Sequence, residues 1–259
     1  MARPITGNMQ PLSPLGLLLL ISAPAFGSFL AVLADRLPRG QSLVGRSACR
    51  SCGAPLAARD LVPGLSFLIN AGRCRQCGAA IPPWLLYMEI AATGLAVIAL
   101  VGTRDAGLAW LVAGFLWCLL ALIVCDLRSL RLPDLLTGAL FVLALALSAR
   151  IGMAGLGEAL IGALVGAGAF WAIRAAYQIL RGREGLGLGD VKLMAGLGAA
   201  LGPLDLPLMV LLASLASLAA ALTGIITTGQ RPAATTPLPF GAALAAAGGL
   251  LWVARHLPL

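Results

Sequence analysis

The chain has 259 residues, of which 60% are hydrophobic and only 11% are charged, and its mean hydropathy is +0.97. These values exclude an ordinary soluble domain and indicate a polytopic membrane protein. Eighteen Lys and Arg residues outnumber ten Asp and Glu residues, an excess that would suit nucleic acid if the basic side chains formed one patch. They lie instead between apolar runs, as expected for charges that orient a membrane protein, so we expect no nucleic-acid partner.

Eight apolar runs predict an all-α fold with eight transmembrane helices. The first run contains a sequence like a signal-peptidase site, but it continues as apolar sequence into a basic loop, which favours a retained span. The sixth run is short and rich in glycine, so its ends are the least certain. The predicted spans are 15–33, 84–101, 107–125, 135–149, 159–173, 191–201, 206–227 and 238–253.

The basic residues predict which side each connection faces. If the long polar segment 34–83 is cytoplasmic, alternation places the connections 126–134, 174–192 and 228–237 on the same side. These four regions hold 14 of the 18 Lys and Arg residues. Because Lys and Arg accumulate in cytoplasmic connections, we expect this side to be cytoplasmic and both termini to lie on the opposite face.

Two acids are the catalytic candidates. Asp190 follows a segment in which glycines alternate with leucines and which includes Gly187 and Gly189. Asp126 directly follows the third apolar run. Two predicted spans separate the acids, and an even number of crossings returns the chain to the same face. Adjacent carboxylates share a proton, so one can act as a base on water while the other donates, as in aspartic proteases. The pattern therefore predicts a peptidase in which the two glycines let a peptide backbone approach closely.

Three other charged residues have more than one interpretation. Asp134 could replace Asp126, but it stands where a predicted helix begins, and the role of helix N-cap is favoured. Glu89 lies inside the second span, and it would either bind a cation or substrate amine or pair with an arginine of the basic loop. Lys192 would either keep Asp190 ionised or contact lipid headgroups.

Four cysteines in segment 34–83 form two Cys-x-x-Cys pairs, Cys49 with Cys52 and Cys74 with Cys77, with 21 residues between the pairs. Four thiolates suit tetrahedral zinc with no open position, which is a structural site. Redox pairs or the absence of a metal are the alternatives, and a cytoplasmic location weakens the disulfide interpretation. The other two cysteines lie seven residues apart on one predicted helix and are expected to pack in the interior.

The order of these pieces resembles the type IV prepilin peptidases, which are bacterial inner-membrane aspartic proteases of the GxGD type. The resemblance covers nearly the whole chain, from about residue 26 to residue 241, and two positions depart from it. Ala31 stands where the family usually has asparagine, and Leu86 stands where it has proline. The pieces are Gly27-Ser-Phe-Leu with Arg36-Leu-Pro, the two cysteine pairs, Asp126-Leu-Arg with Leu132-Pro-Asp134, Gly187-Leu-Gly-Asp190-Val-Lys192, and Pro239-Phe-Gly241.

The resemblance implies a function. The family removes the basic leader of prepilins and pseudopilins after a glycine, on the cytoplasmic side of the inner membrane. Many members then methylate the new N-terminal amine with S-adenosylmethionine. The family's catalytic pair corresponds to Asp126 and Asp190, and its zinc ligands correspond to the four cysteines of the two pairs.

The predicted organisation has three parts: a lead with the first span (1–34), a cytoplasmic zinc lobe (35–83) and a protease bundle of seven helices in membrane lipid (84–259). A transporter whose intramembrane acids bind a cation is the rival interpretation. The acids' position at the membrane edge, the lack of an inverted repeat and the separate cysteine lobe argue against it. A secretion-machine scaffold without catalysis is a third alternative.

Overall fold

The computed structural model describes residues 13–151, 155–182, 185–228 and 238–257. Within these residues every regular element is helical, so the all-α prediction is confirmed, and the only β-type pairings are two isolated bridges near the cysteines. The polar lead and the connection 229–237 lie outside the described residues. The helices are α1 Pro14–Arg36, α2 Leu65–Ile69, α3 Trp84–Gly102, α4 Ala106–Ser129, α5 Asp134–Ile151, α6 Gly155–Arg181, α7 Leu188–Leu201, α8 Leu206–Thr228 and α9 Phe240–His256.

Each of the eight predicted runs is occupied by a helix. Among the described residues five helices, α1, α3, α4, α6 and α8, are long and apolar enough to cross a membrane. The helices α7 and α9 are shorter, with 14 and 17 residues, which makes α7 about 21 Å long, and α5 is not among the five. The chain is therefore a multi-pass membrane protein, and the figure of eight crossings stays a prediction.

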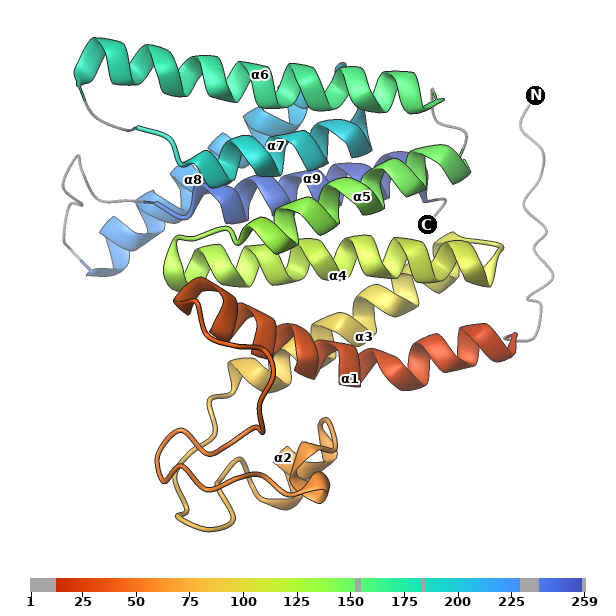
Figure 1. Cartoon of the computed structure of the whole chain (residues 1–259), viewed down its shortest axis with the longest axis vertical. Helices are drawn as coiled ribbons and strands as arrows, with labels where there is room; N and C mark the ends of the chain where they lie inside the picture. The colour runs from red at the N-terminus through yellow and green to blue at the C-terminus, as the bar shows by residue number, and fades with distance from the viewer. Residues whose placement is uncertain (1–12, 152–154, 183–184, 229–237, 258–259) are drawn as a thin grey trace.

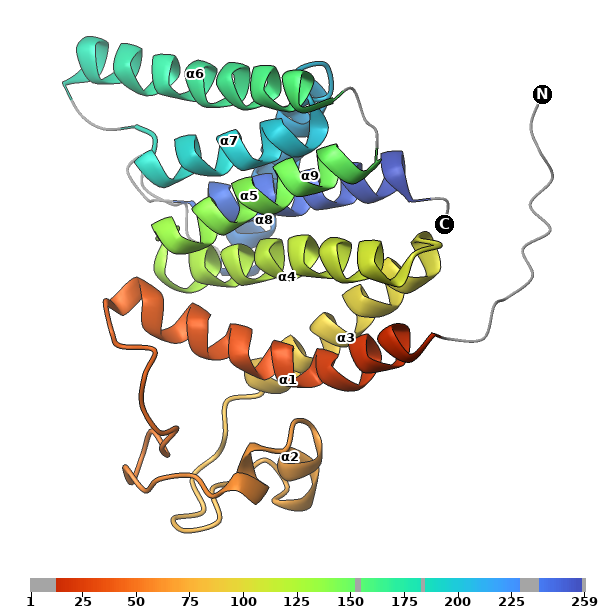
Figure 2. The same cartoon turned by 45° about the vertical axis from the view of Figure 1, so that its right-hand side comes forward.

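The long helices form layers with the cysteine-bearing lobe at one edge (Figures 1 and 2). Helix α6 covers α7, which packs against α5 and α9, and α4 packs against both of the latter. Helices α1 and α3 pack on each other and on α4, while α8 packs mainly on α9. The lobe, residues 37–83, leaves the end of α1 and returns at the start of α3, so it lies at one end of this bundle.

Helices α6 and α7 meet backbone to backbone through glycine. A Cβ atom on Gly162 would collide with the carbonyl oxygen of Gly198, and one on Gly166 would lie 2.7 Å from the carbonyl oxygen of Met194. Small residues allow such close approach between membrane helices, where packing drives association. These glycines therefore allow α6 and α7 to pack with their backbones in contact. Gly202 also ends α7, with φ of +73°.

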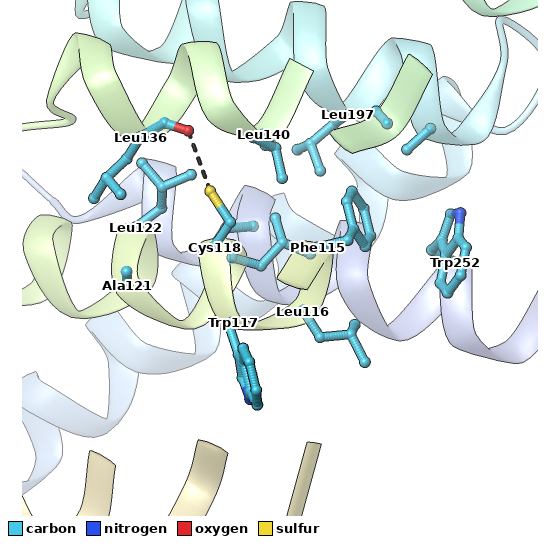
Figure 3. Packing of buried hydrophobic residues seen from close by; sticks show 14 of the residues in the cluster. Phe115, Leu116, Trp117, Cys118, Ala121, Leu122, Leu136, Leu140, Leu197 and Trp252 are labelled. Atoms are coloured by element: carbon cyan, nitrogen blue, oxygen red, sulfur yellow. Dashed lines mark hydrogen bonds between the residues drawn. The ribbon is translucent and has the colours of Figure 1, made fainter. Parts of the chain in front are cut away.

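The bundle interior is filled by aromatic and aliphatic side chains (Figure 3). The rings of Phe115 and Trp252 have centroids 5.1 Å apart and link α4 to α9. The thiol of Cys118 is buried and donates to the carbonyl oxygen of Leu136 at 3.2 Å. Cys125 is fully buried as well, so both cysteines of α4 pack in the interior as predicted.

Most helix ends differ from the ends of the apolar runs, and several helices extend further. Helix α4 continues past its apolar run to Ser129, helix α7 begins before its run at Leu188, and α6 extends to Arg181. Backbone hydrogen bonding continues a helix beyond the last apolar residue when no breaker intervenes. The consequence is that Asp126 and Asp190, predicted just outside helices, lie in the last turns of α4 and the first turn of α7.

Candidate active site and metal centre

The candidate residues gather at one end of the bundle. The end of α4, the starts of α7 and α9, and the two ends from which the lobe extends all lie on the left in Figure 1. The structure therefore brings together the three features that the sequence assigned to one side: Asp126, Asp190 and the four cysteines. The membrane face on which they lie is addressed below.

Asp126 is the only buried acidic residue in the described part of the chain, with 6% of its surface exposed. Its Oδ2 accepts a hydrogen bond of 2.7 Å from the backbone N–H of Ala242, near the start of α9. A buried carboxylate needs such donors because burial removes it from water. This hydrogen bond fixes Oδ2 of Asp126, and Oδ1 takes no part in it.

Asp190 approaches Asp126 around Gly241. A Cβ atom built on Gly241 would lie 2.9 Å from Oδ1 of Asp190 and 3.1 Å from Oδ2 of Asp126. These two distances add to an upper limit of 6.0 Å between the carboxylate oxygens. Both acids line a cavity of about 960 Å³, together with residues from α6, α8, the start of α9 and the loop before α7. Both carboxyl groups therefore lie close together at one cavity, where both could act on the same bound molecule.

The two predicted approach glycines have different surroundings. Gly187 is exposed, precedes α7 in an extended conformation and lines the cavity, and its Cβ position is 3.2 Å from Oδ2 of Asp190. Gly189 also lines the cavity, but a Cβ on it would lie 2.9 Å from Cβ of Leu132. Gly187 therefore offers open backbone, whereas the space next to Gly189 is taken by Leu132.

Lys192 and Glu89 have partners that the sequence did not suggest. Nζ of Lys192 lies 2.6 Å from Oδ1 of Asp134, so these two form an ion pair beside the cavity. Asp134 is the first residue of α5, and its side chain pairs with Lys192 where an N-cap bond was expected. Oε2 of Glu89 accepts from the backbone N–H of Gly64 in the lobe at 2.7 Å, so its partner is an amide and not an arginine.

Gly241 and Ala242 are the site residues that sequence reasoning missed as participants. Gly241 was predicted only as part of the family resemblance, and the residue type of Ala242 does not indicate a role in the site. Ala242 contributes a backbone N–H, and Gly241 contributes space because it has no side chain. Neither contribution can be inferred from the type of the residue alone. The Pro239-Phe-Gly241 turn into an apolar run was the one available signal, since a glycine there allows a close approach.

The four lobe cysteines form a compact cluster. Their sulfur atoms all lie within 4.8 Å of one another, and Sγ of Cys49 is 3.8 Å from Sγ of Cys77. Zn–S bonds of about 2.3 Å in a tetrahedron place sulfurs about 3.8 Å apart, so the geometry fits zinc. Each pair is followed by a glycine with φ of +70°, Gly53 or Gly78, whose N–H returns to the carbonyl of the first cysteine at 2.9 Å.

The acid–base properties of the four thiols also favour a bound cation. Backbone N–H groups of Cys52 and Ser51 lower the pKa of Cys49 to about 6. The N–H of Ala79 favours the thiolate of Cys77, yet the three neighbouring cysteine side chains raise its pKa to about 11. Four adjacent thiols cannot all ionise cheaply unless a metal ion compensates their charge.

The lobe has no core of its own. None of the residues 39–87 is buried, although α2 and two short turns lie within this segment. A segment without buried apolar side chains gains little hydrophobic stabilisation, and small units of this kind commonly rely on a metal. A second cavity, of about 440 Å³, lies between the lobe and helices α1 and α3.

Comparison with known proteins gives the family. Residues 21–103 match the bacterial peptidase A24 N-terminal domain, and residues 113–225 match the type IV leader peptidase family. A prepilin leader peptidase/N-methyltransferase of Aeromonas hydrophila is 39% identical over 213 residues, which are 81% of this chain and 72% of that protein. The chain belongs to the type IV leader peptidase family.

Two further family members carry the same name. The protein of Burkholderia pseudomallei is 40% identical over 216 residues, covering 83% of this chain and 69% of its own length. The protein of Pseudomonas aeruginosa is 33% identical over 257 residues, which cover 87% of this chain and 86% of that protein. No solved structure matches the chain. The family regions contain the four cysteines and both acids, whereas Gly241 and Ala242 lie beyond residue 225.

Proposed function

We propose that this chain is a membrane-embedded aspartic endopeptidase that removes the leader peptide of prepilins or pseudopilins after a glycine. The observation that carries the proposal is the approach of Asp126 and Asp190 around Gly241 at the end of a family-matched bundle. The named relatives are prepilin leader peptidases, and the two matched domains place this chain in their family. A cation transporter, the rival function, has no counterpart among these relatives.

The proposed mechanism uses the two acids without a covalent intermediate. The ionised carboxylate takes a proton from a water molecule while the oxygen of that water attacks the scissile carbonyl carbon. The protonated carboxyl group donates to the carbonyl oxygen, and a proton then passes to the leaving nitrogen as the C–N bond breaks. The N–H of Ala242 holds Asp126 in one orientation, and Gly187 leaves the backbone of the cavity open to an extended peptide.

The proposed location is the bacterial inner membrane, with eight crossings, with the acids at the cytoplasmic edge of the bilayer and with the lobe on the same side. The basic residues of the connections support this side. The proposed parts are residues 1–34, the zinc lobe 35–83 and the bundle 84–259, with the substrate's apolar helix lying in lipid beside the bundle. Labelling single introduced cysteines at Ser47 and Thr103 with an impermeant reagent tests the side, because only position 103 should react from outside intact cells.

We propose zinc as the resident metal of the lobe, held by Cys49, Cys52, Cys74 and Cys77. The sulfur spacing and the lack of any buried residue in the segment 39–87 support a closed structural site. Four protein ligands leave no position for water, so the metal would stabilise the lobe and take no part in hydrolysis.

We propose that the second cavity binds S-adenosylmethionine. Its volume of about 440 Å³ is within the range of small-molecule sites, and its lining combines three carboxylates, four arginines and apolar side chains. Glu89, which accepts from a backbone N–H and is paired with no arginine in the described part of the chain, could pair with the cofactor's positive charge, whereas Asp35 and Asp60 already form ion pairs with arginines. Leu85 and Ile81 offer apolar surface to its base. The chemistry that the cofactor supplies when bound is a methyl group for the new N-terminal amine.

Cleavage of a synthetic prepilin leader peptide by the full-length protein in lipid nanodiscs tests the main proposal. Wild type should cleave after the glycine, and Asp126→Asn and Asp190→Asn should each lower kcat by about 10²–10⁴-fold. Asp134→Asn is the matched control and should retain most activity. An intact leader with folded wild type would disprove the proposed function, and loss of cleavage in Asp134→Asn but not in Asp126→Asn would disprove the pair.

A further inference from the structure

Trp84, the first residue of α3, lies between the metal lobe and the Asp126 end of α4. The guanidinium carbon of Arg128 is 4.1 Å from the centroid of the Trp84 ring, and that of Arg50 is 5.6 Å from it. Both distances are within the range of cation–π attraction, for which tryptophan is the best aromatic partner. One side chain of α3 therefore contacts a charged group from each of two other segments.

The two arginines belong to the two parts of the proposed enzyme. Arg50 is the residue after Cys49 in the first cysteine pair, so the metal-binding turn determines its position. Arg128 is two residues beyond Asp126 in the last turn of α4. No acidic partner of Arg128 is found among the described residues, and its contact with Trp84 is the one observed for its guanidinium.

A second set of contacts keeps Arg50 beside the bundle. Its Nη2 is 3.0 Å from Oδ2 of Asp35, in the last turns of α1, and Arg39 contacts Oδ1 of the same carboxylate at 3.2 Å. Asp35 is only 16% exposed, so this network is more shielded than a surface ion pair. Arg50 is thus held from one side by α1 and from the other by the ring of α3.

We propose that Trp84 transmits the metal-dependent order of the lobe to the end of α4 and so positions Asp126. Because residues 39–87 include no buried side chain, removal of the metal would release the turn that carries Arg50. Arg50 would then leave the Trp84 ring, and the terminal turn of α4 would lose support next to Asp126. Trp84 is a positioning residue here, because it does not line the catalytic cavity.

The cleavage test of this coupling rests on the proposed function, whereas hydrogen exchange tests the coupling without it. Hydrogen exchange of the backbone amides 127–131 in full-length protein reports directly on the end of α4. Removal of zinc from wild type should speed exchange there by up to about tenfold, the order expected when the Arg50 contact is lost and the Trp84 ring holds Arg128 less firmly. In Trp84→Ala the exchange should already be fast, and chelation should add little, because the two changes act through one contact.

Cleavage gives the second readout. Trp84→Ala and chelated wild type should each lower kcat of the leader peptide by about tenfold with little change in KM, and the two effects should not add. Trp84→Phe, which keeps an aromatic face, should restore part of the rate. Trp171→Ala is the matched control, because Trp171 is an exposed tryptophan of α6 and should change neither readout.

The outcomes separate this proposal from the function. If wild type does not cleave the leader but exchange behaves as stated, the function is wrong and the coupling stands. If exchange at residues 127–131 is the same with and without zinc, the coupling is wrong whatever the activity. Equal effects of chelation in wild type and in Trp84→Ala would also overturn it, and metal analysis of Trp84→Ala verifies that its lobe is still loaded.

Discussion

Lys192 and Asp134 form an ion pair of 2.6 Å beside the cavity that contains Asp126 and Asp190. The pair connects α7 to the start of α5, across 58 residues of sequence. It gives each of these two charged residues a partner outside the catalytic pair. Lys192 therefore acts in the packing of α7 against α5 and is not needed to balance Asp190.

Removal of this ion pair should have a small effect. We expect Lys192→Gln to lower the free energy of unfolding by less than about 1 kcal/mol, because both side chains are well exposed to solvent. A double-mutant cycle with Asp134→Asn, followed by thermal unfolding in low and high salt, measures the coupling. Loss of cleavage in Lys192→Gln comparable to that of Asp190→Asn would contradict the assignment.

Gly241→Ala should lower kcat strongly while leaving the fold intact. The new methyl group would lie 2.9 Å from one carboxylate and 3.1 Å from the other, which forces at least one acid to move. A displacement of about 1 Å at the reacting groups can cost about 10²-fold in rate. Steady-state cleavage kinetics check the loss, and Gly138→Ala on α5, where a Cβ meets nothing within 4 Å, should keep wild-type rates.

Loss of the lobe thiols should remove the metal. A Cys49→Ser/Cys74→Ser protein should contain little zinc, because two of four ligands are missing and hydroxyl groups bind zinc weakly. The far-ultraviolet circular dichroism should remain largely helical, since residues 39–87, which carry the four cysteines, include no buried residue. Elemental analysis measures the metal, and Cys118→Ser should retain it; unchanged zinc in the double variant would rule out this site.

Asp105 should make stability depend on pH in acid. Its carboxylate accepts from the N–H groups of Leu108 and Gly107 at the start of α4, and these bonds, with Arg150 nearby, lower its pKa below the ordinary value of 3.8. A carboxyl group with a lowered pKa in the folded state stabilises it above the unfolded pKa, and this contribution disappears as pH falls through the folded value.

Thermal unfolding of wild type and Asp105→Asn between about pH 6 and pH 2 tests this. Asparagine keeps a capping oxygen but cannot titrate, so the two melting temperatures should differ at about pH 6 and converge as pH falls below the ordinary value of 3.8. A constant difference across this range would show that the charge of Asp105 contributes nothing.

The helices were predictable because apolar runs and their lengths determine which segments enter a membrane. The even number of runs between Asp126 and Asp190 also predicted that they lie at one end of the bundle, where the structure places them. The cysteine spacing predicted the sulfur cluster, because each Cys-x-x-Cys pair forms one tight turn that brings its two thiols together. These inferences depend on local pattern and on counting crossings.

The remaining site features depend on contacts between distant segments. The N–H of Ala242 reaches Asp126 across 116 residues, and it is a backbone group that every residue except proline carries. The lobe's contact with α4 runs through Trp84, whose type alone favours a membrane-interface anchor. Helix ends were misplaced for a related reason: Asp126 and Asp190 are polar, yet the helical backbone continues through them.

The length of α7 has a consequence for the membrane itself. A helix of about 21 Å is shorter than a hydrocarbon layer of about 30 Å, so at least one of its ends stops below the headgroups. The end with Asp190 opens into the 960 Å³ cavity, through which bulk solvent can reach that depth. Hydrolysis should then depend on acyl-chain length, and thicker bilayers should slow the enzyme by sealing this inlet, which makes lipid composition a control on its rate.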